Sequence, residues 1–378
     1  MTTPDHEGRP GDGNAVERGP RPGSGSAAER GPRPLLEVHE LSKTYHSKSL
    51  GARLRRANEV KALREVSFDV KRGETLGLVG ESGSGKSTAA SCVLRLTEPD
   101  SGSVTFDGVD VRSLSKSELR RLRSRMQIVF QDPYGSLDPR FSVRELVEEP
   151  LLVHGLHDDR ARRERALQML ERVGLSASQA ERNAHAFSGG QRQRIAIARA
   201  LVLNPELVVL DEPVTALDVS VQAQVLNLLT ELQKELNLTY LFIVHDLAVA
   251  QYLCHRIAVM YLGEIVEMAS SQELFDNPLH PYTVTLLMAA PVPDPDVMAS
   301  RRTALGTTAP AGSKPGTGCP LQPRCPVGMN RAECASQRPV LREVSPGHQV
   351  ACHYPGELQA AATAPRTNTA IPESPSNP

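Results

Sequence analysis

The chain has 378 residues, a formal net charge of −1, 39% hydrophobic residues and 23% charged residues. This balance is typical of a soluble globular protein and argues against bulk electrostatic binding to nucleic acid or to lipid. No apolar run approaches the roughly 20 residues that span a bilayer, and the first residues show no secretory signal, so we expect a cytoplasmic location that is compatible with docking on a membrane partner.

Both ends of the chain are predicted to be disordered tails. Residues 1–34 are rich in Gly, Pro, Arg and Ser and contain ERGPRP twice, and residues 357–378 are rich in Ala, Thr and Pro. Such segments bury too little apolar surface to offset the entropy lost on ordering. Between the tails we expect a large folded domain at 35–290 and a Cys- and Pro-rich region at 291–356.

The elements of the folded domain can be taken in chain order from hydrophobic periodicity. The first part predicts a strand leading into a turn at 35–45, a basic loop at about 46–59, an alternating strand at 60–70, a buried strand at 75–80 and a helix at 86–96. The second part predicts a hairpin strand at 101–108, a buried strand at 126–130, a helical subdomain at about 143–187, a helix at 189–203, a buried strand at 207–213, a helix at 219–236, a strand at 238–246 and a hairpin at 256–269. Strands that alternate with helices indicate an α/β fold with a mostly parallel sheet. After Pro291 we expect irregular structure.

A glycine-rich loop carries the strongest chemical signal. GESGSGKST fits G-x-x-x-x-G-K-[ST] between a predicted strand and a predicted helix, which is the context that this phosphate-binding loop requires. The glycines let backbone N–H groups surround phosphate oxygens at a helix N-terminus. Lys86 is expected to reach the β- and γ-phosphates, Ser87 to bind Mg²⁺ and Thr88 to lie at the α-phosphate. The bland alternative is a glycine turn without a ligand. The predicted loop comprises Gly80, Glu81, Ser82, Gly83, Ser84, Gly85, Lys86, Ser87 and Thr88.

Two apolar strands end in residues that can act on a bound nucleotide. LVVLDE ends in Asp211 and Glu212, and FIVHD ends in His245. Strand ends are where open α/β sheets bind ligands. Asp211 fits an outer-shell Mg²⁺ role, Glu212 the base that polarises the attacking water, and His245 a contact to the γ-phosphate. Taken alone, Asp211 and Glu212 could instead belong to a solvated turn, and His245 could be a histidine at a strand end that is hydrogen-bonded for structural reasons only.

A second anion-binding helix start follows Phe187. Ser188, Gly189, Gly190 and Gln191 open the helix at 189–203. Because one chain needs a single such site for its own nucleotide, the second is expected to serve a nucleotide held by another subunit. The alternative is a simple N-cap by Ser188, which uses the same geometry.

On these segments the chain resembles the ATP-binding cassette family from Leu35 to about Ala290. The resemblance implies a P-loop ATPase core with a mostly parallel sheet, an antiparallel β subdomain and a helical subdomain. It also implies that Tyr45 stacks on adenine and that Gln131 joins Mg²⁺ and the water to a transmembrane partner. Phe187 replaces the more usual leucine of the signature Ser188–Gln191. Ala216, Leu217 and Asp218 match the loop that crosses the dimer interface.

Several segments resemble those of the oligopeptide and dipeptide import subgroup. Two of them, NPLHPYTVTLLMAAPVP and GCPLQPRCP, lie near the end of the chain. This implies a peripheral subunit on the cytoplasmic face of the membrane, two permease subunits, an extracytoplasmic binding protein and no nucleic acid. It further implies a second ATPase subunit, as a heterodimer, with a homodimer left open. Gln131 and the helical subdomain near Tyr134 would pass movement to the permeases. The alternatives are import of nickel or another small solute, a soluble ATPase of the same fold, and a non-catalytic nucleotide sensor.

Six cysteines fall into two groups. Cys92 and Cys254 lie inside regular patterns and are expected to be small core residues. The other four cluster near the end, and their gaps are wider than common zinc spacings and differ from ferredoxin runs. The subgroup resemblance suggests an iron–sulfur cluster or a metal there; the alternative is reduced thiols packed as small apolar groups. These four are Cys319, Cys325, Cys334 and Cys352.

Overall fold

The computed structural model describes residues 33–46, 59–156, 158–215, 217–289 and 317–358. All the elements below belong to the compact unit Pro34–Pro378. Several expectations lie outside the described residues: both tails over most of their length, the basic loop at 47–58, Ala216, and the first part of the Pro-rich region at 290–316.

The smaller of two sheets is antiparallel and four-stranded, in the order β2-β1-β4-β5. Its strands alternate buried and exposed side chains because one face packs on the core while the other faces water. Leu36 pairs with Val70 on one neighbour and with Phe106 on the other. The strands are β1 (Leu36–His46), β2 (Glu59–Val70), β4 (Ser101–Phe106) and β5 (Val109–Asp110).

The larger sheet has eight strands in the order β11-β12-β10-β9-β3-β8-β7-β6. The five from β9 to β6 are parallel, and β10, β12 and β11 continue the sheet antiparallel. The parallel strands are short and almost fully buried, as expected for a sheet that is covered on both faces. They are β3 (Thr75–Val79), β6 (Met126–Val129), β7 (Leu207–Asp211), β8 (Thr239–Val244) and β9 (Arg256–Tyr261); the antiparallel ones are β10 (Glu264–Ser270), β11 (Arg342–Ser345) and β12 (His348–Val350).

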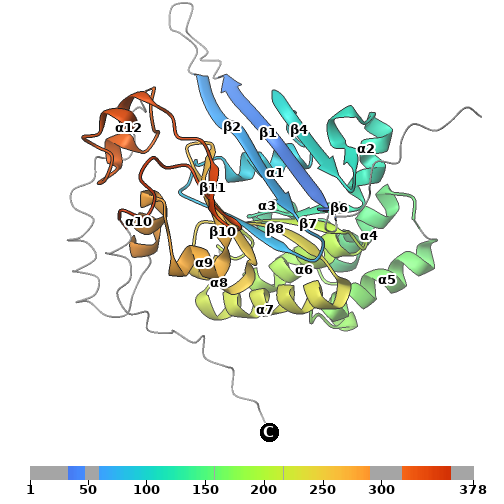
Figure 1. Ribbon diagram of the computed structural model, residues 1–378. Helices are drawn as coiled ribbons and strands as arrows, with labels where there is room; N and C mark the ends of the chain where they lie inside the picture. The colour runs from blue at the N-terminus through green and yellow to red at the C-terminus, as the bar shows by residue number, and fades with distance from the viewer. Residues whose placement is uncertain (1–32, 47–58, 157, 216, 290–316, 359–378) are drawn as a thin grey trace, which may run out of the picture. The chain divides into compact units, whose positions relative to one another are not determined.

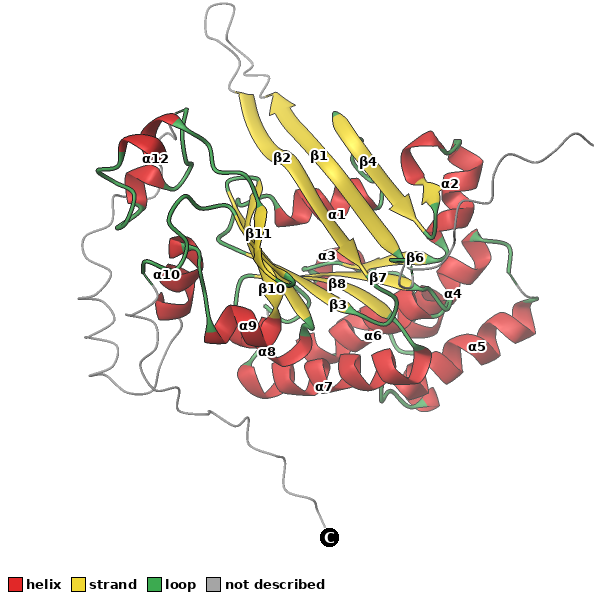
Figure 2. Ribbon diagram, viewed as in Figure 1, coloured by secondary structure: helices red, strands yellow, loops and turns green. Residues whose placement is uncertain are grey.

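Helices cover the larger sheet (Figure 1), and the secondary-structure view separates them from the strands (Figure 2). Helix α1 contacts strands of both sheets and so lies between them. Helices α6, α7 and α8 cover the opposite face of the larger sheet (Figure 1). The helices are α1 (Lys86–Val93), α2 (Lys116–Arg123), α3 (Pro133–Ser136), α4 (Val143–Val153), α5 (Asp159–Arg172), α6 (Gly189–Leu201), α7 (Val219–Leu236), α8 (Leu247–Leu253), α9 (Ser271–Asp276), α10 (Pro281–Ala289) and α12 (Ala332–Ser336).

Local sequence explains where these helices begin. Ser142 and Glu145 form a capping box on α4, and Asp158 accepts the Ala161 N–H at the start of α5. Helices α4, α5 and α6 pack on one another and make up a helical layer. Helix α7 ends at Asn237, which takes a left-handed φ of 51° that favours Asn or Gly.

Two hydrophobic cores follow from this layering. One joins α1 and the inner faces of both sheets, and the other joins the remaining helices to the larger sheet. Cys92 lies in the first and Cys254 in the second, which confirms both as buried core residues. Within the described residues, no helix combines the length and apolar character needed to cross a membrane.

Two local expectations were wrong. β1 continues through Tyr45 to His46, instead of turning before it, because β2 pairs with it along its whole length. The region after Pro291 was expected to be irregular, yet β12 pairs with β10 and carries β11 beside it, and Cys334 lies within the helix α12. Strands β11 and β12 have four and three residues, which is too few to show an alternating pattern of apolar and polar residues in the sequence.

Candidate functional site

The phosphate loop connects β3 to α1 at the carboxyl edge of the larger sheet. Gly85 has a φ of 106°, and a Cβ there would lie 2.4 Å from the Ala62 carbonyl oxygen, so glycine is required. The loop curls around the buried Lys86 ammonium, which donates to the carbonyl oxygens of Gly80 at 2.8 Å and Glu81 at 3.0 Å. Ser82 and Gly83 are exposed, and Thr88 is half-buried one turn into α1.

Burial and nearby charges shift the pKa of Lys86 in opposite directions. Burial lowers the pKa of Lys86, while the nearby carboxylates of Glu212, Asp211 and Glu81 act to raise it. The ammonium therefore depends on acidic neighbours from two segments, the end of β7 and the phosphate loop itself. A cation held in this way at a helix N-terminus is suited to bind an anion with several charges.

Ser87 meets the end of β7. Its hydroxyl donates to Asp211 Oδ1 at 3.0 Å. Burial raises the pKa of Asp211, the Ser87 hydrogen bond opposes this, and the charge of Glu212 adds to it. A hydroxyl and a carboxylate side by side are oxygen ligands that Mg²⁺ prefers.

Two predicted residues contact the carboxylate of Glu212, whose side chain is 12% exposed. Gln131 Nε2 donates to Glu212 Oε2 at 2.9 Å, and His245 Nδ1 lies 3.2 Å from the same oxygen. Glu212 itself has a φ of 46°, and its N–H donates to the Ile243 carbonyl oxygen at 3.0 Å, which fixes the turn after β7. Sequence reasoning missed Thr215, whose hydroxyl donates to Glu212 Oε2 at 3.1 Å; its position three residues after the acid was the only signal.

The start of α6 is capped from within. Ser188 accepts the Gln191 N–H at 3.3 Å, and Gln191 Oε1 accepts the Ser188 N–H at 3.1 Å. A Cβ on Gly190 would lie 2.2 Å from Val221 Cγ1, so this glycine lets α6 approach α7, and a Cβ on Gly189 would touch Leu217. Among the described residues no hydrogen bond or ion pair joins Ser188–Gln191 to the phosphate loop of the same chain.

Asp218 and Tyr45 lie apart from the Glu212 cluster. Asp218 caps α7 by accepting the Val221 N–H at 2.9 Å and the Ser220 hydroxyl at 2.7 Å. Tyr45, near the end of β1, is 43% exposed, and the centroid of its ring lies 5.8 Å from Lys43 Nζ. An exposed aromatic ring can stack on another flat ring.

Four cysteines line one small cavity, which we call the cysteine pocket: Cys319, Cys325, Cys334 and Cys352. All four are free and buried, and the cavity has a volume of about 10 Å³. Burial raises the pKa of Cys319 to about 11 and that of Cys352 to about 12. In the part of the chain that the structure describes, no group of three or more His, Cys, Asp or Glu residues is arranged to hold a metal ion.

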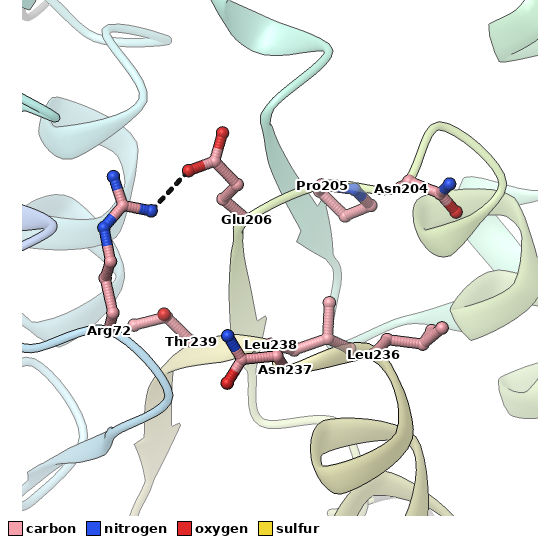
Figure 3. Close-up of a pocket in the computed structure, with 8 residues that line it drawn as sticks. All are labelled: Arg72, Asn204, Pro205, Glu206, Leu236, Asn237, Leu238 and Thr239. Atoms are coloured by element: carbon pink, nitrogen blue, oxygen red, sulfur yellow. Dashed lines mark hydrogen bonds and ion pairs between the residues drawn. The ribbon is translucent and has the colours of Figure 1, made fainter.

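A larger cavity, of about 260 Å³, lies at the opposite edge of the sheet, where β7 and β8 begin (Figure 3). Arg72 and Glu206 face each other across it, 2.6 Å apart (Figure 3). Arg125 also pairs with Glu206. Because its charged groups are paired with one another and it is remote from the phosphate loop, this cavity is not the nucleotide site.

Comparison with known proteins agrees with this geometry. A family model described as "ABC transporter" matches residues 63–215, and one described as "Oligopeptide/dipeptide transporter, C-terminal region" matches residues 266–334. A putative peptide import ATP-binding protein of Brucella ovis is 52% identical over 318 residues, which are 84% of this chain and 97% of that protein. The oligopeptide transport ATP-binding protein AppF of Bacillus subtilis is 49% identical over 321 residues, 84% of this chain and 97% of that protein.

Solved structures are similar as well. The ATP-binding cassette MJ0796, in a dimeric post-hydrolysis state bound to ADP and Pi, has a TM-score of 0.55 and 33% identity, covering 62% of this chain and 98% of that one. The cbiO1 protein of Clostridium perfringens, part of an ABC transporter complex, has a TM-score of 0.56 and 31% identity, covering 64% and 90%. The expected α/β fold, with a P-loop core and a mostly parallel sheet, is confirmed.

Proposed function

The chain belongs to the ATP-binding cassette family of ATPases, and from this membership we propose that it hydrolyses ATP to drive an importer of oligopeptides or dipeptides. The observation that carries the ATPase part is the cluster at the strand ends. Gln131, Glu212 and His245 come from three separate segments and meet on one carboxylate oxygen beside the phosphate loop.

Each residue then has a part in the reaction. The glycine loop and Lys86 bind the phosphates, and Mg²⁺ would be held by Ser87 and Gln131 with Asp211 behind them; the bound ion would supply charge neutralisation at the phosphates. Glu212 orients and polarises the attacking water, and His245 contacts the γ-phosphate. Tyr45 stacks on the adenine.

The second half of the site comes from another subunit. Ser188 and Gln191 cap this helix start with their own N–H groups, and the N–H groups of Gly189 and Gly190, which have no hydrogen-bond partner among the described residues, can bind a γ-phosphate. Since they make no hydrogen bond or ion pair with the loop of their own chain among the described residues, the reaction needs a partner whose loop they face. Asp218 and the loop around it would cross that interface. We propose a second, related ATPase as the partner, in a heterodimer.

Import explains the remaining parts. Relatives named for peptide import share about half of their residues with this chain over 97% of their length, and the match to the oligopeptide transporter C-terminal region supports peptide over nickel. We propose that the chain sits on the cytoplasmic face of the membrane against two permeases, fed by an extracytoplasmic binding protein. Gln131 and a helical subdomain at about 143–187 would pass movement to the permeases.

The test is ATP hydrolysis by the full chain, with and without co-expressed permeases. Glu212→Gln removes the base while keeping the shape, and we expect the rate to fall at least about 100-fold, the scale of a lost general base. Glu235→Gln is a matched control, because Glu235 forms only an exposed pair with Arg172. An unchanged rate in Glu212→Gln would rule out Glu212 as the base. Uptake of labelled peptide against labelled nickel by the reconstituted importer tests the cargo.

We also propose that the cysteine pocket binds a thiolate-preferring metal or an iron–sulfur cluster. Four buried thiols converge in a segment that has little hydrophobic core of its own. This supports a bound metal or cluster, because such segments need a cross-link or a metal to stabilise them. The pocket would have to widen, because about 10 Å³ is the space of one water. An anaerobic absorption spectrum with iron, zinc and sulfide analysis decides the matter: a protein free of all three has packed thiols instead.

A further inference from the structure

Glu81, the second residue of the phosphate loop, is held by two side chains from the far end of the sequence. Its backbone N–H donates to the Tyr282 hydroxyl at 2.9 Å. Its carboxylate accepts from both terminal nitrogens of Arg324, each at 3.3 Å. These partners lie 201 and 243 residues away in sequence. Neither is part of the glycine motif or of the cluster on Glu212.

Tyr282 is a rigid support. It is 1% exposed, at the start of α10, and its ring lies 4.6 Å from that of Tyr261 at a tilt of 52°. The Tyr282 N–H donates to His280 Nδ1 at 3.1 Å, and His280 is itself buried. A buried hydroxyl anchored in this way can define the position of the backbone that it accepts from.

Arg324 ties the loop to the cysteine pocket. It ends the short turn Gln322–Arg324, which lies between Cys319 and Cys325. The turn is closed by the Arg324 N–H donating to the Leu321 carbonyl oxygen at 2.8 Å, and Leu321 also lines the cysteine pocket. The Arg324 side chain is 19% exposed. The packing of the cysteine pocket therefore sets where the guanidinium lies.

The charge of Glu81 makes this contact matter for a nucleotide. A carboxylate within a phosphate loop repels a triphosphate, and the Arg324 guanidinium offsets that negative charge. The Glu81 side chain is 43% exposed, so solvent screens the effect and keeps it moderate. Loss of the pair would leave one uncompensated negative charge in the loop.

We propose that Arg324 and Tyr282 are positioning residues for the phosphate loop, and that through Arg324 the cysteine-lined C-terminal segment adjusts the affinity for ATP. This rests on the proposed ATPase function. It adds a regulatory contact that the nucleotide motifs themselves do not contain. A change in the packing of the cysteine pocket would then move the turn Gln322–Arg324 and, through the ion pair of Arg324 with Glu81, the phosphate loop.

The test is the dissociation constant of a fluorescent ATP analogue, measured on the full chain together with KM and kcat. Arg324→Ala is expected to weaken binding about three- to fivefold and to raise KM with kcat unchanged, as for a lost ground-state contact. Arg324→Lys should recover part of the loss. Tyr282→Phe keeps the ring and removes the acceptor of the Glu81 N–H, and should also weaken binding about fivefold. Arg342→Ala is the control, because Arg342 lies in the same C-terminal segment on the exposed strand β11 and does not line the cysteine pocket.

The decisive comparison is the double variant Arg324→Ala with Glu81→Gln. If Arg324 acts by offsetting the charge of Glu81, adding Arg324→Ala to Glu81→Gln changes the affinity less than twofold. An equal loss in both backgrounds, or an unchanged affinity in Arg324→Ala, overturns the proposal. Failure of the unaltered chain to bind the analogue would instead overturn the proposed function, so the two failures are distinguishable.

Discussion

Single residues at the site carry charges that the folded chain itself disfavours. Burial lowers the pKa of Lys86 and raises that of Asp211, so each charged form is held at a cost to folding. The hydrogen bond from Ser87 and the carboxylates around Lys86 reduce this cost only in part. Such strain is expected where a nucleotide and its metal would supply the missing charges.

Asp211→Asn should therefore stabilise the nucleotide-free chain at neutral pH. The pKa of Asp211 in the folded chain lies above its ordinary value of 3.8. Well below pH 3.8 the carboxyl is protonated in both the folded and the unfolded chain and does not change the free energy of unfolding. As pH rises through the ordinary and then the folded pKa, its ionisation lowers the free energy of unfolding. We expect Asn, which can still accept from Ser87, to raise Tm by about 2 °C at pH 7 and by nothing near pH 3. Thermal unfolding over this pH range measures it; a lower Tm at pH 7 would show that the charge is well accommodated.

The strand-end residues also show what sequence reasoning could reach. Lys86, Ser87, Asp211, Glu212 and His245 follow apolar runs, and the parallel register then brings their ends together. Thr215, Tyr282 and Arg324 could not be found in this way. Their contacts depend on where a turn or a distant segment packs, and no local period encodes that.

Among the elements, the hairpin β11–β12 is held to the larger sheet by a buried ion pair. His348 Nε2 lies 2.7 Å from Glu267 Oε1, and both side chains are nearly inaccessible. The Glu267 carboxylate also accepts the N–H groups of Leu279 and His280, at 2.7 and 3.0 Å. One buried carboxylate thus fastens the C-terminal hairpin and the approach to α10 together.

This pair makes the attachment of the hairpin depend on pH. Burial lowers the pKa of His348, but the hydrogen bond and attraction to Glu267 outweigh it and raise the pKa above 6.5. The stabilisation is therefore full below pH 6.5 and is lost as pH rises through the folded pKa. Hydrogen exchange of residues 342–350 should accelerate beyond the intrinsic base-catalysed trend above pH 7. Exchange that follows only that trend would contradict the account.

A substitution tests the same element. His348→Leu leaves the buried Glu267 without its cation and is expected to cost about 3 kcal/mol. The double variant with Glu267→Gln removes the charge as well and should recover part of that loss. Denaturant unfolding provides the measurement, and Glu343→Gln on the exposed strand β11 is the control. Equal stability of the single and double variants would exclude a charge effect.

Most elements of the core could be predicted because their patterns are long. The helix at 219–236 has the observed bounds, and the buried strands at β3, β7 and β8 were found from their apolar runs. The hairpin β11–β12 was missed because its first strand, REVS, is exposed along its whole length and has no alternating pattern. The position of this hairpin in the sheet is set by pairing with β10 and by the ion pair with Glu267. Both are tertiary contacts, which the local sequence does not encode.

At the scale of the whole molecule, we propose that the chain holds halves of two different nucleotide sites. In this proposal the phosphate loop with Glu212 forms one half, and the capped start of α6 forms the other. Within one chain the described residues leave these halves unconnected. Hydrolysis should therefore require a second subunit, and ATP should hold the two subunits together until Glu212 acts.

The most direct measurement is ATP retention by an assembled ATPase pair in which neither subunit has its base, with Glu212→Gln in this chain and the matching change in its partner, compared with and without Ser188→Arg in this chain. The account predicts that the Glu212→Gln pair keeps ATP bound and stays associated. Ser188→Arg should release the ATP that faces it and weaken the association, while the phosphate loop of its own chain still binds the fluorescent analogue. Equal ATP retention with and without Ser188→Arg would contradict a nucleotide shared between two subunits.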